Sequence, residues 1–273
     1  MIVSIKMVIL CPIIKLDAKE TFEVCKAVPL KLVVVRLQDL VSKRTFKFNK
    51  VHSDIVSAGG LHRFLDFNGQ ILLSLIMRDE IIVNFSPNKY ASAINSLNPD
   101  FYTTIDGETY EGEYSNSIRE LKRIHRENQE LVKLCPKSRP IGLVKGCTEN
   151  QTKLHMDLLK SMGIEDFVFH IGDFFRHGDP EMIRKAHSFS NIIRKSARCL
   201  ILYGMGSQDR LLEFSFADIY VSFKHFVTAK NGMKFVGTKE VKYVGGYNPS
   251  IITNNFIQMC KNVESLKKQT TLS

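Results

Sequence analysis

The chain has 273 residues, 44% of them hydrophobic, and a formal net charge of +10 at pH 7. This length suits one α/β barrel and this composition allows a sizeable core, while the lack of an apolar run of about 18 residues argues against a membrane-spanning helix. The positive charge favours a polyanionic partner such as nucleic acid, or reflects no more than a basic surface.

The amino-terminal run MIVSIKMVILCPII is apolar but lacks the features of a signal peptide. A signal peptide carries its charge first and a small-residue cleavage site afterwards, whereas Lys6 stands inside this run. We therefore predict a pair of strands at the amino terminus, a cytoplasmic protein and no association with a membrane.

Short runs of apolar and β-branched residues recur along the rest of the chain and predict strands. Seven are evident, at 31–37, 69–75, 101–106, 141–146, 166–172, 198–204 and 218–223. An eighth is expected either at 79–85, DEIIVNF, or in the amino-terminal region.

Amphipathic helices are predicted between these strands. Their starts are marked by capping residues, namely Ser86 before Pro87, Thr148, Asp179 before Pro180, and Ser207. Gly163 is expected to end the helix that Thr148 starts. Strands alternating with helices indicate parallel βαβ units, and seven or eight units over this length favour a single-domain, closed (β/α)8 TIM barrel over an open sheet.

Six isolated cysteines give no metal-ligand pattern. None forms a CxxC pair, and most stand in apolar contexts where a thiol acts as a small hydrophobe; they are Cys11, Cys25, Cys135, Cys147, Cys199 and Cys260. We expect no metal site and no cofactor.

In a barrel of this kind the carboxyl ends of the strands surround the active site. That rule selects a set of candidate mouth residues: Ser74, Asp106, Lys145, Gly172, Asp173, Gly204, Gly206 and Ser222. A carboxylate at one strand end beside a basic side chain on the next strand would make an acid–base site. Each residue taken alone is better explained as a helix cap or a loop contact, whereas the convergence of several on one rim favours a functional site.

Four segments in order resemble the tRNA-guanine transglycosylases, a pentosyltransferase family that includes archaeosine-type enzymes and DNA 7-deazaguanine-inserting paralogues. They are AGGLHRFLDFNGQIL, RPIGLVKG, FVFHIGDFFRHGDP and CLILYGMGSQDRLLEFSFADIYVSF with TAKNG after it. The resemblance implies a transglycosylase-like barrel at 30–240, preceded by amino-terminal strands at 1–29 and followed by a closing helix at 241–273. It also implies a nucleic-acid partner (tRNA or DNA), a 7-deazaguanine-type base, and a partner subunit or homodimer.

The family's catalytic residues are not matched. The resemblance places Ser74 where the family has its acid/base aspartate and Val221 where it has its nucleophile, and the family's zinc cluster is missing after residue 240. Asp218 matches the first aspartate of the nucleophile motif. Because strand side chains alternate with period two, Asp218 and Val221 are expected to face opposite ways.

Base recognition is better matched. The resemblance makes Asp106 the base-binding carboxylate, replaces a glutamine by Lys145, and keeps backbone room at Gly172, Gly204 and Gly206. The residues expected to lie near a polynucleotide are His62, Arg63, Lys224 and Lys230. His62 and Arg63 fit a structural role in the scaffold as well as a polynucleotide contact.

Three interpretations stay open. In the first, the chain is a divergent transglycosylase in which Asp106, Asp173 or Asp218 has taken over a catalytic role. In the second it binds nucleic acid without exchanging the base, as a partner subunit or a later-acting protein. In the third it is an unrelated barrel enzyme.

Overall fold

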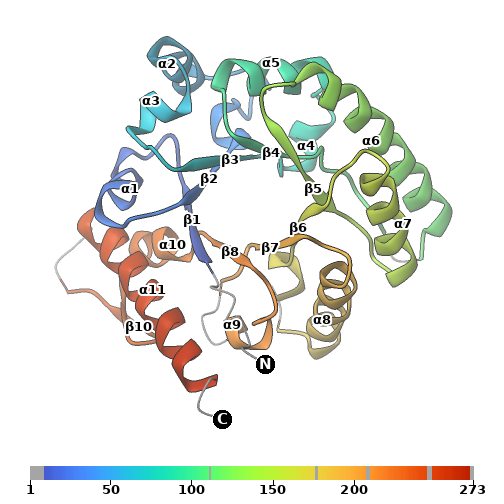
Figure 1. The fold of residues 1–273 in the computed structure, drawn as a ribbon. Helices are drawn as coiled ribbons and strands as arrows, with labels where there is room; N and C mark the ends of the chain where they lie inside the picture. Colours follow the sequence, from blue (N-terminus) through green and yellow to red (C-terminus); the bar gives the residue numbers. More distant parts are fainter. Residues whose placement is uncertain (1–8, 111, 176–177, 207–209, 245–247, 271–273) are drawn as a thin grey trace.

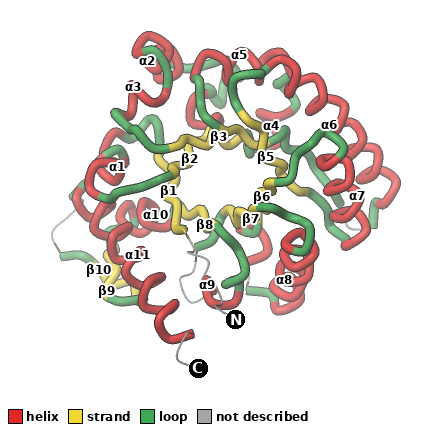
Figure 2. Tube along the Cα trace, viewed as in Figure 1, coloured by secondary structure: helices red, strands yellow, loops and turns green. Residues whose placement is uncertain are grey.

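Eight parallel strands close into a barrel in the computed structural model, which describes residues 9–110, 112–175, 178–206, 210–244 and 248–270. The strands follow chain order: β1 (Ile9–Ile14), β2 (Leu32–Arg36), β3 (Gln70–Ser74), β4 (Phe101–Thr103), β5 (Arg139–Val144), β6 (Asp166–His170), β7 (Cys199–Tyr203) and β8 (Ile219–Ser222). Pairing of Cys11 with Val221 closes the ring between β1 and β8. Figure 2 shows this ring at the centre of the molecule with helices around it. The predicted (β/α)8 barrel is confirmed.

The eighth strand is β1, from the amino-terminal region. All but the first of its residues are buried, as a strand covered on both faces requires. A strand at 79–85 is wrong, because Asp79–Ile82 forms the short helix α4 with Asp79 and Glu80 in its first turn, where a helix favours acidic side chains. The sequence predicts a pair of strands at the amino terminus, but β1 is the one strand there within the described residues. The barrel therefore takes its first strand from segment 1–29.

The helices lie outside the strands (Figure 1). After α4 come α5 (Pro87–Leu97), α6 (Tyr114–Leu134), α7 (Glu149–Lys160), α8 (Pro180–Arg194), α9 (Arg210–Glu213) and α10 (Lys224–Lys230). The amino-terminal part adds α1 (Glu23–Ala27), α2 (Lys50–Ala58), α3 (Leu61–Leu65) and the 3₁₀ helices η1 (Lys19–Thr21) and η2 (Leu37–Leu40).

Three predicted caps are confirmed. The side chains of Ser86, Thr148 and Asp179 each accept a hydrogen bond from a backbone N–H in the first turn of the following helix. Helix α7 ends at Lys160, so Gly163 lies in the turn beyond it rather than at its cap. Ser207 lies outside the described residues.

Side chains alternate between two apolar layers. On β6, Phe167 and Phe169 pack outward against the helices, whereas Val168 packs inside the barrel with residues such as Leu143 and Ile201. Strand positions of the same parity as Val168 therefore face the barrel interior, and the last of them reach its mouth.

The carboxyl-terminal part covers the outside of the barrel beside β1. A hairpin of β9 (Met233–Val236) and β10 (Lys239–Lys242) packs with α11 (Ser250–Thr270), where the Asn255 side chain accepts a hydrogen bond from the Phe235 backbone. The predicted carboxyl-terminal helix is thus present. Within the described ranges, no helix combines the length and apolar character needed to cross a membrane.

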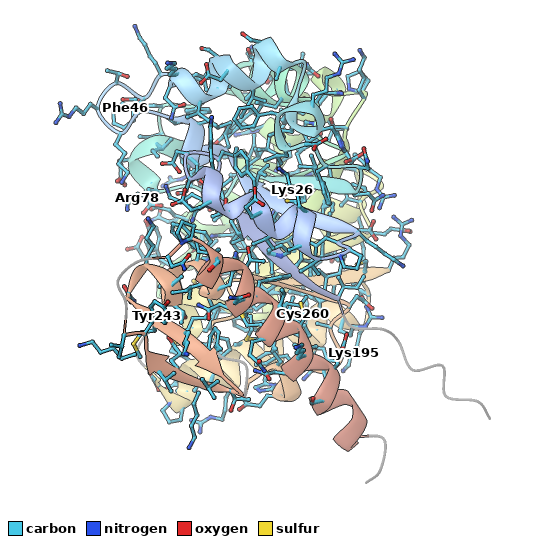
Figure 3. All side chains as sticks on the ribbon, turned by 90° about the vertical axis from the view of Figure 1, so that its left-hand side faces the viewer. Lys26, Phe46, Arg78, Lys195, Tyr243 and Cys260 are labelled. Carbon is cyan, nitrogen blue, oxygen red and sulfur yellow. The ribbon has the colours of Figure 1, made fainter. Side chains whose placement is uncertain are left out.

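The two ends of the barrel are distinct in the side view of Figure 3. Arg78 follows β3 and labels the mouth, where the strands finish, on the left. Lys195 precedes β7 and labels the opposite end, where the strands begin. This distinction decides which predicted site residues can act together.

Candidate functional site at the barrel mouth

A buried ion pair lies at the mouth between the ends of β4 and β5. Lys145 Nζ is 2.8 Å from Asp106 Oδ1, and the two side chains are 24% and 8% exposed. The backbone N–H of Gly107 also donates to Oδ1, at 2.8 Å. Asp106 Oδ2 accepts no hydrogen bond from the described residues, so one carboxylate oxygen is held and the other can receive a donor.

A buried histidine holds the backbone of Lys145 in place. The Lys145 backbone N–H donates to His155 Nδ1 at 2.9 Å, and His155 is fully buried on α7. Burial, with the nearby charge of Lys145, lowers the pKa of His155 to about 3, so the ring is neutral. Burial also disfavours the charge on Lys145, but the ion pair with Asp106 outweighs this effect and raises the pKa of Lys145. Lys145 therefore stays charged at neutral pH.

His170 and Tyr203 stand beside this pair. They are register partners at the ends of β6 and β7, and their rings meet edge to face with centroids 5.5 Å apart. Burial raises the pKa of Tyr203 to about 12, with the Ser74 hydroxyl as a hydrogen-bond partner that opposes the rise. Both rings have the interior-facing parity, which brings them to the mouth.

Gly172 and Gly204 make the room that the His170 ring occupies. A Cβ atom on Gly172 would lie 3.2 Å from His170 Nε2, and one on Gly204 would lie 3.1 Å from His170 Cδ2. Gly204 also has φ +90°, which disfavours any side chain there. The room expected for a ligand is thus partly filled by an imidazole that sequence reasoning missed.

Asp173 also lies at this end of the barrel. It is in the 3₁₀ helix η3 (Gly172–Phe175), its Oδ2 is 3.7 Å from His170 Nδ1, and its side chain is 60% exposed. Its charge contributes to the raised pKa of Lys145, which places it within electrostatic range of that side chain. Asp106, Lys145 and Asp173 are therefore brought together, with His170 among them.

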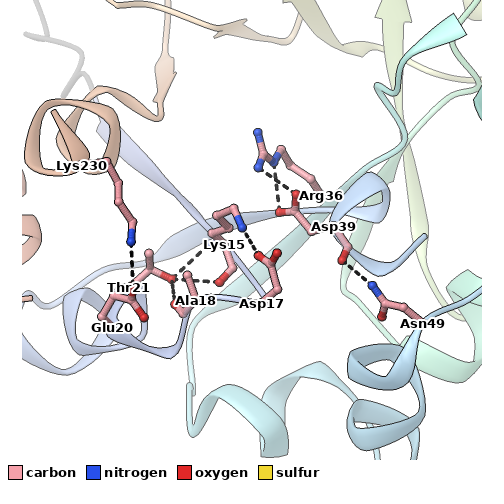
Figure 4. Close-up of polar contacts among 9 residues, drawn as sticks. All are labelled: Lys15, Asp17, Ala18, Glu20, Thr21, Arg36, Asp39, Asn49 and Lys230. Carbon is pink, nitrogen blue, oxygen red and sulfur yellow. Dashed lines mark hydrogen bonds and ion pairs between the residues drawn. The ribbon is translucent and has the colours of Figure 1, made fainter. Parts of the chain in front are cut away.

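A second ion pair, also missed from the sequence, lies across the mouth at the end of β2 (Figure 4). Arg36 donates to both carboxylate oxygens of Asp39, at 2.8 and 3.1 Å, and its guanidinium lies 4.4 Å from the ring centroid of Phe223. Burial raises the pKa of Asp39, and Arg36 opposes that rise. The strand-end rule that selected Asp106 would have selected Arg36 had the predicted strand ended one residue earlier.

Ser74 and Val221 are both fully buried at the carboxyl ends of their strands. Val221 packs in the interior layer of the barrel, and the Ser74 hydroxyl accepts a hydrogen bond from the backbone of Ile76 at 3.3 Å. Neither side chain can supply a carboxylate.

Asp218 belongs to the opposite end of the barrel. It precedes β8, pairs with Arg194 of α8 at 2.9 Å, and accepts the backbone N–H of Leu200 at 2.8 Å. It faces outward while Val221 faces inward, so the predicted opposite facing is confirmed. Asp218 and Asp106 lie at opposite ends of the barrel, so the two aspartates do not share one site.

The remaining rim candidates have local roles. The Ser222 hydroxyl accepts a hydrogen bond from the backbone N–H of Lys224, the first residue of α10, at 3.1 Å. Gly206 is exposed, and a Cβ there would meet nothing within 4 Å.

The residues expected to contact a polynucleotide do not form one surface. His62 lies near the amino ends of β3 and β4, where its ring nitrogens contact the Asp100 carboxylate and the Phe67 carbonyl, each at 3.0 Å. His62 is therefore scaffold, and the exposed Arg63 lies beside it on α3. Two lysines on α10 are paired with acids: Lys224 with Glu240 at 2.6 Å and Lys230 with Glu20 at 3.4 Å, the latter drawn in Figure 4.

A cavity of about 620 Å³ adjoins the mouth on the β3–β4 side, between α4 and α6. Its lining includes Gly107, directly after Asp106, and acidic side chains of Asp79, Glu108 and Glu120. Burial and the neighbouring Asp79 raise the pKa of Glu108. This acidic rim would repel a polyanion, so nucleic acid would have to approach from another side.

Within the described part of the chain, no group of three or more His, Cys, Asp or Glu side chains is arranged to hold a metal ion. Comparison of the chain with protein-family models and with curated proteins found no match.

Proposed function

We propose that this chain is a divergent tRNA-guanine transglycosylase-like protein whose barrel mouth binds a guanine-type base, such as a 7-deazaguanine, belonging to tRNA or DNA. The observation that carries the proposal is the Asp106 carboxylate, held by Lys145 through one oxygen with the other oxygen open. The guanine edge presents adjacent N–H donors, and a buried carboxylate is a strong acceptor for them.

Base exchange by the chain alone is not part of the proposal. Exchange through a glycosyl–enzyme intermediate needs a carboxylate nucleophile, and the family's two catalytic positions are occupied by the buried Ser74 and Val221. This observation favours the second candidate function, a nucleic-acid-binding protein that acts as a partner subunit or on an already modified base.

Nucleic-acid binding is supported by the net charge of +10. Phosphate contacts release counterions, so a gel-shift series from low to high salt should show a steep loss of affinity for the cognate polymer. Affinity for tRNA and DNA that stays flat across the series would remove nucleic acid as the partner.

Incorporation of radiolabelled guanine tests the chemistry. We expect little or no incorporation into bulk tRNA or DNA by the wild-type chain. The paired changes Ser74→Asp and Val221→Asp restore the family's two carboxylates and are the variant best placed to gain exchange. Robust exchange by the wild type, or a trapped covalent adduct with nucleic acid, would show that another carboxylate serves as nucleophile.

A further inference from the structure

We infer that a basic hairpin at the mouth, residues 41–48, binds the phosphate backbone of the nucleic acid, an inference that rests on the proposed nucleic-acid binding. The basic hairpin follows β2 and η2, so it stands at the end of the barrel where the strands finish. Figure 3 shows its Phe46 at the same end as Arg78. A polyanion bound there would lie beside the mouth rather than at the far end of the barrel.

The basic hairpin and the start of α2 carry positive charge without a compensating acid. Between residues 41 and 52 the sequence has no acidic residue and four basic ones, Lys43, Arg44, Lys47 and Lys50. All four are exposed, and none pairs with an acidic side chain among the described residues. By contrast, Lys224 and Lys230, which the sequence places near a polynucleotide, pair with acids.

Contacts with the rest of the molecule hold the basic hairpin in one shape. Val41 and Phe48 form an antiparallel bridge, and the Phe48 ring meets Phe85 edge to face with centroids 5.9 Å apart. Phe46 has φ +53°, which is uncommon for an aromatic residue, and its carbonyl accepts a hydrogen bond from Lys89 Nζ at 2.7 Å. The backbone that presents the charges is therefore ordered, so less conformational entropy is lost when a ligand binds.

Phe85 stands between two regions of opposite charge. Its ring packs against the basic hairpin, and it also lines the acidic cavity that includes Asp79 and Glu108. A phosphate backbone is attracted to the first region and repelled by the second, so the polymer would reach the mouth over the basic hairpin. Lysine and arginine contact phosphates whatever the base sequence, so these contacts provide affinity and position rather than sequence specificity.

Salt-dependent binding of bulk tRNA and of a random-sequence DNA duplex tests the inference. The hairpin variant replaces exposed cations by a neutral side chain in Lys43→Gln, Arg44→Gln and Lys47→Gln. The matched control makes the same change of charge at exposed lysines that precede strands at the opposite end of the barrel, in Lys31→Gln, Lys137→Gln and Lys195→Gln. A charge-preserving variant carries Lys43→Arg and Lys47→Arg.

Each phosphate contact adds roughly 0.9 to the slope of log Kd against log salt concentration on duplex DNA. We expect the hairpin variant to lower that slope by about 2 or more, and to weaken binding of the partner polymer at least about tenfold at low salt. The control and the charge-preserving variant should bind within about twofold of the wild type. Thermal unfolding of all four proteins should agree, because the replaced side chains are exposed.

The outcomes separate the two proposals. A steep wild-type salt slope that the hairpin variant retains, or that the control loses equally, would overturn the inference and leave nucleic-acid binding in place. No salt-dependent binding of either polymer by the wild type would refute both. Hairpin-dependent binding by protein that takes up no 7-deazaguanine would support the inference and refute the proposed base recognition. Hairpin-dependent binding only to vesicles of phosphatidylserine and phosphatidylcholine would assign these charges to a lipid surface and overturn the inference.

Discussion

Asp106 and Lys145 form an ion pair across the ends of two neighbouring strands, with 2.8 Å between Oδ1 and Nζ. Both charges are largely removed from water, so each depends on the other for its compensation. Like Arg36–Asp39, this pair is a buried acid–base contact at the mouth, and it links the stability of the barrel to the proposed site.

Breaking the pair by Asp106→Asn should therefore reduce the free energy of unfolding by about 1–3 kcal/mol, since Lys145 loses its counter-ion while remaining partly solvated. Adding Lys145→Met to the same chain should recover part of that loss. Chemical denaturation of the two single variants, the double variant and the wild type measures the coupling. Losses that simply add would contradict a direct interaction.

The glycines around His170 offer a matched comparison. Gly204→Ala should destabilise the protein by about 1–3 kcal/mol, because φ is positive there and the new Cβ would press on His170 and Gly172. Gly206→Ala has open space around it and should change the unfolding free energy by less than about 0.5 kcal/mol. Equal effects in thermal unfolding would show that His170 does not need the room at Gly204.

Val221→Asp tests how firmly the barrel interior excludes a charge. Val221 is fully buried among apolar side chains, so the carboxylate should cost about 3 kcal/mol or more at pH 8. Burial raises the pKa of such a carboxyl, so the loss relative to wild type should be smaller at pH 5, where the group is neutral. Val221→Asn, which cannot titrate, is the control and should show the same loss at both pH values.

His225 predicts an acid-sensitive fold. It is fully buried between Phe223 and Phe256, neither ring nitrogen has a hydrogen-bond partner among the described residues, and burial lowers its pKa to about 3. The unfolded chain then binds more protons below about pH 6.5, so stability falls as the pH drops from there toward 3 by about 1.4 kcal/mol per pH unit for this residue. His225→Leu should make the stability fall less steeply with acid. Parallel stability curves for His225→Leu and wild type between pH 6 and 4 would contradict this.

The fold could be predicted because apolar strand runs alternate with capped helices along the chain. The number of these units over this length favours a closed βα barrel over an open sheet. The strand-end rule also found Asp106, Lys145 and Ser74. It missed Arg36 and His170 because the predicted strands at 31–37 and 166–172 run past the observed ends and hide both residues inside a strand. Asp218 came from the family resemblance and not from this rule, and because it directly precedes β8 it lies at the end of the barrel away from the mouth.

The relation between His170 and its two glycines lay beyond sequence reasoning. Gly204 is 34 positions away in the chain, and its closeness to the ring depends on the register of β6 against β7. Contacts that depend on register between strands cannot be read from local patterns.

Calorimetric titration with 7-deazaguanine tests the central claim, that the mouth binds a guanine-type base through Asp106. Wild-type protein should bind at one site, and Asp106→Asn should lose about 1–3 kcal/mol of binding free energy, roughly a 5- to 150-fold rise in Kd, because the base donors lose a charged acceptor. Asp157→Ala, on the exposed part of α7, is the matched control and should bind like the wild type, with unfolding curves confirming that all three proteins are folded. Equal affinities of wild type and Asp106→Asn, or no binding by the wild type, would contradict the claim.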